Sequence, residues 1–192
     1  MTTIKPALHH VTFRTTRMAE MIDWYSKVIG AKVNFRDQYA AWTTNDGANH
    51  RIAFLGVPGL CDDPDKRSHN AMHHCAFEYE SFADLMKSYK RLANLGIRPA
   101  FSLDHGLTIS LYYKDPDDNY VELQSDAFRD WAKSSEWMRT SPDFASNPIG
   151  TFFDPDKVYE DHIAGRGDDE LHRAMRAGDY KPAVTPDIGL PA

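Results

Sequence analysis

The sequence has little cysteine, no long apolar run and no cluster of basic residues. Its two cysteines, Cys61 and Cys75, show no CxxC spacing, so neither a disulfide framework nor a cysteine zinc site is expected. No run approaches the ~20 apolar residues of a membrane span, and the start of the chain has no apolar stretch typical of a signal peptide. A net charge of −6 provides no basic face for phosphates. We therefore expect a cytoplasmic protein with reduced thiols that binds neither nucleic acid nor a membrane.

A repeat is the most informative feature that the sequence does contain. LHHVTF at 8–13 and MHHCAF at 72–77 have an apolar residue, two histidines and a phenylalanine at the same positions, 64 residues apart. The same offset aligns Tyr25 with Tyr89. Such a repeat indicates a duplicated structural unit. With 192 residues, 42% of them hydrophobic, the chain can bury a core built from two units.

Each copy of the repeat predicts a short strand, a helix and three further strands. Ser81 and Asp84 form a variant of the capping box before the second helix, and Gly30 and Gly96 stand where a left-handed helix stop is expected. The strands after the two helices are predicted at 31–37, 39–44 and 50–56, and at 99–103, 107–114 and 119–124. The unit is therefore βαβββ, present twice.

These units predict an α+β fold. A βαβββ unit has one sheet face covered by its helix and the other face open. Two modules, at 5–58 and 71–126, placed side by side would form an open sheet around a cavity for a ligand. We expect residues 1–126 to form one metal-binding domain, and residues 127–192 to form a partly helical C-terminal extension.

The C-terminal extension has its own helical patterns, at 126–139 and 168–177. It either wraps the surface of its own domain or grips a neighbouring subunit, and we expect a homo-oligomer. Three large side chains of the first helix are available for packing: Phe128, Trp131 and Met138. Three histidines outside the repeat lie in polar or tail segments and are expected to be solvated: His69, His162 and His172.

Alternation along the strands predicts which residues face the cavity. Three strands each direct one metal-competent side chain inward: His10, His74 and Glu122. A single strand histidine is more often structural, and a lone glutamate can be a solvated edge charge. Two imidazoles and one carboxylate at repeat-related inward positions instead predict a facial triad, typical of non-haem Fe(II) oxygenases. His9 and His73 fall on the opposite parity and are second-choice ligands, expected to act as structural or hydrogen-bonding neighbours.

The paired modules with these three residues resemble the vicinal oxygen chelate superfamily. HGLTISLYYKDPDDNYVEL resembles its extradiol ring-cleaving dioxygenases. HHCAFEYESFADL, LDHGLTISLYYKDP and DWAKSSEWMRTSPDFASNPIG resemble its small one-domain enzymes of the biphenyl-2,3-diol 1,2-dioxygenase type. The resemblance to the superfamily covers residues 5–126.

The resemblance implies cleavage of a catechol-type aromatic diol by O2 at Fe(II), although the ligands themselves would also accept Mn(II). His50 matches the family's acid and base, His105 a pocket histidine, and Tyr112 a tyrosine that hydrogen-bonds the substrate hydroxyl. The family's DPDGN turn carries Asp118 in place of glycine here. Aspartate tolerates the left-handed conformation at modest cost.

Of three other functions known on this fold, the first is disfavoured and two remain open. A glyoxalase-type isomerase would need a glutamate in the last strand of the first module, and HRIAFLGVPG contains none. A thiol transferase of the fosfomycin-resistance type would use a similar triad but would need a cationic pocket for a phosphonate. A non-catalytic, drug-sequestering protein would need no metal.

Overall fold

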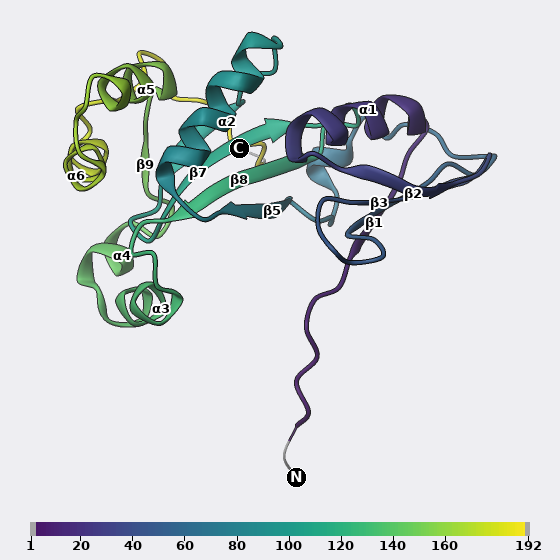
Figure 1. Ribbon diagram of the computed structural model, residues 1–192, viewed down its shortest axis with the longest axis horizontal. Helices are drawn as coiled ribbons and strands as arrows, with labels where there is room; N and C mark the ends of the chain where they lie inside the picture. The colour runs from purple at the N-terminus through teal and green to yellow at the C-terminus, as the bar shows by residue number, and fades with distance from the viewer. Residues whose placement is uncertain (1–2, 191–192) are drawn as a thin grey trace. The chain divides into compact units, whose positions relative to one another are not determined.

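The computed structural model describes residues 3–190; the first two residues of the predicted module domain and the last two of the extension lie outside this range. The chain divides into two compact units (Figure 1). The first comprises Met1–Lys66 and Asp115–Asp118, and the second comprises Arg67–Lys114 and Asn119–Ala192. Each unit is described by itself.

The first unit is a βαβββ module. Its elements are β1 (Val11–Arg14), α1 (Met18–Ile29), β2 (Lys32–Arg36), β3 (Ala40–Thr44) and β4 (Ile52–Leu55). The sheet order is β1-β4-β3-β2, with β1 parallel to β4 and the other pairs antiparallel. The prediction of one strand, one helix and three strands is confirmed, including the helix stop at Gly30, whose φ is 71°.

Helix α1 covers one face of this sheet through a buried aromatic cluster. The rings of Phe13, Tyr25 and Phe54 lie 5.3 to 6.2 Å apart, centroid to centroid. The Tyr25 hydroxyl donates a hydrogen bond to Asp115, 3.2 Å away. The side of β1 that carries Phe13 therefore faces the helix, as strand alternation predicts.

The second unit begins with the same module. Its elements are β5 (His74–Tyr79), α2 (Phe82–Asn94), β6 (Phe101–Asp104), β7 (Thr108–Lys114) and β8 (Tyr120–Asp126). The sheet order is β5-β8-β7-β6-β9, and β5 runs parallel to β8. Ser81 caps α2 as predicted, because its hydroxyl accepts the Asp84 N–H at 3.1 Å. The outermost strand β9 (Thr151–Phe152), not predicted, comes from the C-terminal extension.

Helix α2 lies across one face of the second sheet (Figure 1). Leu85 and Leu92 on the helix, and Val121 and Leu123 on β8, are fully buried. The alternate residues of the strands therefore point to the opposite face of the sheet, and these include Glu122.

The extension wraps the surface of its own unit. Its helices are α3 (Trp131–Thr140), α4 (Pro142–Ser146), α5 (Pro155–Ile163) and α6 (Asp168–Ala177). Asp156 at the start of α5 accepts hydrogen bonds from Tyr89 of α2 and from Arg98, at 2.6 and 2.9 Å. Helix α6 agrees with the predicted 168–177. None of these helices, nor any other in residues 3–190, has the length and hydrophobicity needed to cross a membrane.

The prediction for the first helix of the extension was partly wrong. It begins at Trp131 because β8 continues to Asp126, Arg129 takes a positive φ of 53°, and Asp130 caps the helix. Trp131 and Met138 are 70% and 45% exposed, so they do not form its packing face. Trp137 packs there instead, against Phe128 and Phe144.

Two of the three histidines expected to be solvated are not. His162 and His172 each retain only 21% of their side-chain exposure. His162 packs against the ring of Phe82, and His172 lies 3.2 Å from the buried carboxylate of Asp104. Only His69 is exposed as predicted. These contacts could not be predicted from local sequence patterns, because both partners lie far away along the chain.

The turn at residues 115–118 yields a stability prediction. Asp118 has a φ of 59°, which confirms its expected left-handed conformation. We expect Asp118→Val to lower the free energy of unfolding by about 1–2 kcal/mol, because a β-branched side chain is strained there. Asp118→Gly is the control and should stay within about 0.5 kcal/mol of wild type. Urea titrations would measure both, and equal stability of the two variants would contradict the prediction.

Candidate metal centre and active site

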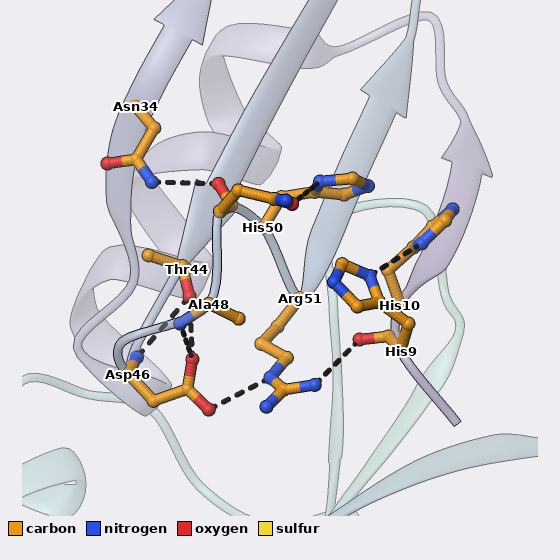
Figure 2. A network of polar contacts seen from close by, with 9 residues as sticks. His9, His10, Asn34, Thr44, Asp46, Ala48, His50 and Arg51 are labelled. Carbon is orange, nitrogen blue, oxygen red and sulfur yellow. Dashed lines mark hydrogen bonds and ion pairs between the residues drawn. The ribbon is translucent and has the colours of Figure 1, made fainter. Parts of the chain in front are cut away.

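Three histidines gather at the start of β1 and β4 in the first unit (Figure 2). The ring centroid of His50 lies 4.2 Å from that of His10 and 5.2 Å from that of His9. Their ligand atoms all lie within 4.8 Å of one another. Neutral imidazole nitrogen is a good ligand for divalent iron, manganese or zinc. The cluster therefore has the donor chemistry of a metal site.

Arg51 holds the backbone of this cluster in place (Figure 2). Its guanidinium donates to the carbonyl oxygen of His9 and to Asp46, each at 2.9 Å. Hydrogen bonds from the Ala48 amide and from Arg51 lower the pKa of Asp46, so this carboxylate stays ionised. The parallel pairing of β1 with β4 then brings His10 beside His50.

The His50 side chain accordingly favours its neutral form. Loss of hydration, followed by the neighbouring charges of His10 and His9, lowers its pKa below the usual value. Nδ1 of His50 lies 2.6 Å from the amide oxygen of Asn49, and since that oxygen only accepts, Nδ1 carries the proton. Nε2 is then free to accept a proton from another molecule.

In the second unit, His74 and Glu122 form a close pair. His74 Nε2 and Glu122 Oε2 are 3.1 Å apart. Two ligand atoms at bonds of about 2.1 Å in adjacent positions of one octahedral ion lie roughly 3 Å apart, so this pair fits a shared metal ion.

Glu122 keeps its charge although it is only 5% exposed. Burial by itself would raise its pKa, but hydrogen bonds with His74 and Ser110, and the charges of His74 and His105, lower it below the usual range. A buried, ionised carboxylate beside an imidazole is a suitable ligand pair for a divalent cation.

His105 and Tyr112 lie next to this pair. His105 Nε2 is 3.0 Å from the Tyr112 hydroxyl, and the imidazole also hydrogen-bonds the backbone carbonyl of Ile149. Burial lowers the pKa of His105, although the charge of Glu122 opposes the shift. Burial, and then the charge of Glu122, raise the pKa of Tyr112, so its hydroxyl stays protonated and can donate a hydrogen bond.

An aromatic wall adjoins these polar groups on the same face of the sheet. Phe101 stacks on Tyr112 with ring centroids 4.3 Å apart, and Tyr120 packs edge-on against Phe101 at 5.2 Å. Leu103 and, from the extension, Phe152 and Ile188 complete this apolar cluster. These side chains are nearly fully buried, so they fix the position of the Tyr112 ring beside the polar groups.

The last described residues of the chain reach this wall. The carbonyl oxygen of Ile188 lies 3.0 Å from His73 Nε2, and the backbone of Gly189 lies so close to Tyr120 that a Cβ at Gly189 would stand 2.4 Å from that ring. Asp187 is paired with Arg67, the closer oxygen at 2.6 Å. The end of the extension is thus fixed beside the candidate site.

The two histidine pairs of the repeat have nearly the same local geometry. Their Nδ1 atoms are 3.1 Å apart in His9–His10 and 2.8 Å apart in His73–His74. The two rings of each pair are inclined at 85°. His9 and His73 thus each lie within hydrogen-bonding distance of the next histidine, and His9 also belongs to the cluster with His10 and His50.

The structure places the predicted site residues in two groups. In the first unit His10 lies beside His50. In the second unit His74, Glu122, Tyr112 and His105 lie together.

Sequence reasoning missed several contributors to the second group. They are Phe101, Ile188 and Asp104, which lies under the turn that carries His105. Only Asp104 left a signal in the sequence, as an acidic residue in a strand with otherwise apolar or small side chains.

Comparison with known proteins agrees with this architecture. The chain belongs to the Glyoxalase/Bleomycin resistance protein/Dioxygenase superfamily, whose family model matches residues 7–123. The recognition of this superfamily and the predicted α+β fold of two βαβββ sheets with a helical extension are confirmed.

Among its relatives are two enzymes of Rhodococcus globerulus. Biphenyl-2,3-diol 1,2-dioxygenase 2 is 36% identical over 189 residues, which cover 98% of this chain and 96% of that protein. Biphenyl-2,3-diol 1,2-dioxygenase 3 is 34% identical over 169 residues, 88% of each chain. The match to the first extends through the C-terminal extension as well as the modules.

Solved structures confirm the fold of the modules. A glyoxylase/bleomycin resistance protein/dioxygenase domain from Frankia sp. EAN1pec superposes with a TM-score of 0.55 at 20% identity, over 64% of this chain and 99% of that one. A lactoylglutathione lyase from Agrobacterium tumefaciens superposes with a TM-score of 0.51 at 16% identity, over 64% of this chain and 95% of that one. At these identities the likeness shows the fold alone.

The lowered pKa of His105 yields a pH prediction. A histidine whose pKa is lower in the folded than in the unfolded state contributes stability above about pH 6.5, which is lost as the pH falls toward the folded value. The free energy of unfolding of the metal-free protein should therefore fall more steeply from pH 7 to 5 in wild type than in His105→Gln. The difference in slope is at most about 1.4 kcal/mol per pH unit. Urea titrations across this range would measure it, and parallel slopes would contradict it.

Proposed function

We propose that the protein is an extradiol dioxygenase, which inserts both atoms of O2 into a catechol-type aromatic diol at a non-haem Fe(II) centre. The observation that carries the proposal is the buried, ionised Glu122 with His74 at 3.1 Å, on a sheet face that also holds an aromatic wall. Near full-length similarity to two biphenyl-2,3-diol 1,2-dioxygenases supports it.

In this proposal His10, His74 and Glu122 hold the metal, and His9 and His73 support them. Two imidazoles and one carboxylate leave positions on the ion for other ligands. Bound Fe(II) would supply Lewis-acid activation of the diol and the redox coupling between the diol and O2. The same donors accept Mn(II), and iron is preferred here by family resemblance.

His50 serves as acid and base in the proposed reaction. Its lowered pKa makes it neutral near pH 7, with Nε2 free to accept a proton from a diol hydroxyl. The protonated imidazole can later return that proton to an oxygen atom of the reacting molecule. An imidazole is suited to both steps because it titrates near neutrality.

His105 and Tyr112 stabilise negative charge that develops on oxygen. Tyr112 remains a hydrogen-bond donor because its raised pKa keeps the phenol protonated. The imidazole of His105 fixes the direction of that hydroxyl at 3.0 Å. The buried rings of Phe101 and Tyr120 pack behind Tyr112 and hold its ring in position.

The first test is oxygen uptake by the anaerobically purified protein reconstituted with Fe(II) or Mn(II), with a panel of catechols and detection of a yellow ring-opened product. We expect uptake with colour in wild type, and loss of bound metal and activity in His74→Ala and Glu122→Gln. Glu78→Gln is the matched control, because Glu78 is an exposed glutamate on β5. Metal binding without uptake would favour the thiol transferase, and absence of metal would favour a sequestering protein.

A second test separates proton transfer from metal binding. We expect His50→Gln and Tyr112→Phe to keep their iron but to lose about 100-fold or more in kcat, as removal of an acid, a base or an oxyanion donor does. Tyr113→Phe is the control: the neighbouring tyrosine points to the opposite face, and its buried hydroxyl has no hydrogen-bond partner among the described residues. Iron loss in His50→Gln or Tyr112→Phe, or equal kcat in all three variants, would contradict these roles.

A further inference from the structure

The turn that carries His105 is built on a buried carboxylate. Asp104 ends β6, and its Oδ1 accepts the backbone N–H of Gly106 at 2.8 Å. Gly106 has a φ of 87°, and the chain re-enters the sheet at Thr108. This side-chain hydrogen bond closes the turn, so the orientation of Asp104 determines where His105 is presented.

Asp104 requires a partner from elsewhere in the chain. It is fully buried, and its second oxygen, Oδ2, has no hydrogen-bond partner among the described residues. A buried carboxylate is costly unless a donor or a positive charge lies next to it. His172 of α6 supplies a partner to the other oxygen, Oδ1, with Nε2 3.2 Å away.

The extension also confines this turn by close packing. A Cβ at Gly106 would lie 2.0 Å from Arg176 and 2.3 Å from Trp137, both of which belong to the extension. A Cβ at Gly150 would lie 2.2 Å from the carbonyl oxygen of Asp104. The Ile149 carbonyl hydrogen-bonds the His105 ring. Residues from α3, α6 and the segment before β9 thus contact the turn.

We propose that His172 is a positioning residue, which acts through Asp104 to hold His105 against Tyr112. The hydrogen bond to Asp104 fixes the carboxylate, the carboxylate fixes the turn, and the turn fixes the imidazole 3.0 Å from the Tyr112 hydroxyl. The C-terminal extension is therefore a part of the active site rather than a cover for the surface. This inference rests on the proposed function, in which His105 and Tyr112 act on the substrate.

The test compares His172→Leu, which removes the donor, with His172→Gln, whose amide keeps a donor at similar reach. His162 provides matched controls, His162→Leu and His162→Gln, because it lies in the same extension, has the same 21% side-chain exposure and also stands beside an aspartate. Steady-state kinetics with the best catechol, iron content and thermal stability are measured for all four, at a temperature where each is folded.

We expect His172→Leu to lower kcat about 10- to 100-fold, the usual effect of losing an orienting hydrogen bond, with KM changed less than about threefold and iron content unchanged. His172→Gln should recover most of the lost kcat, and the His162 variants should match wild type. The proposal is overturned if His172→Leu keeps the wild-type kcat. It is also overturned if the decrease in kcat is fully explained by a lower iron content or by a smaller fraction of folded protein. Failure of His172→Gln to recover kcat also overturns it.

A separate measurement distinguishes this inference from the proposed reaction. Amide hydrogen exchange of the peptide spanning residues 103–112 does not require turnover, and we expect it to be several-fold faster in His172→Leu than in wild type or His162→Leu. If wild type cleaves no catechol, the proposed function fails, and this exchange result alone supports or overturns the positioning of the turn. Unchanged exchange overturns it.

Discussion

The candidate site depends on keeping a charged carboxylate inside a sheet. Glu122 is almost completely buried on β8, and burial disfavours its charged form. Hydrogen bonds with His74 and Ser110 offset this cost, so the neighbouring strands must present polar side chains on the face that carries Glu122. Strand alternation places these polar side chains on that face, since Tyr112 of β7 pairs directly with Glu122 of β8. On the opposite face of the same strands, Leu111, Val121 and Leu123 are fully buried and pack under α2.

The same constraint applies to a second buried carboxylate, Asp104, at the end of β6. This second buried carboxylate has only the Gly106 amide and His172 as hydrogen-bond partners among the residues described. Because a buried carboxylate needs a hydrogen-bond partner, Asp104 of the βαβββ module contacts His172 of helix α6 in the C-terminal extension. The extension also adds β9 to the sheet and brings Ile188 against the aromatic wall. The second unit is thus a module whose sheet is extended and partly covered by residues that follow the repeat.

Much of the fold could be predicted from the sequence because its signals are local. The period of two in LHHVTF and MHHCAF, the cap at Ser81 and the left-handed stops at Gly30 and Gly96 each act within a few residues. Helix α3 was misplaced for a local reason as well, since Asp130 is the better cap but Ala127 and Phe128, shortly before it, extend the helical pattern toward the N-terminus. The parity that directs His74 and Glu122 to one face follows from the sheet pleat, and needs no tertiary information.

The sequence by itself determined the duplicated βαβββ unit, the shared sheet face of His74 and Glu122, and the left-handed turn at Asp118. Only the tertiary structure decided the partners of Asp104, Tyr120 and His73, because these are His172, Gly189 and Ile188, which are between 68 and 115 residues away along the chain. Periodicity and capping report the conformation of neighbours in sequence. Pairing of a buried charge with a distant histidine depends on how helices and strands pack, and no periodic pattern in the sequence signals it.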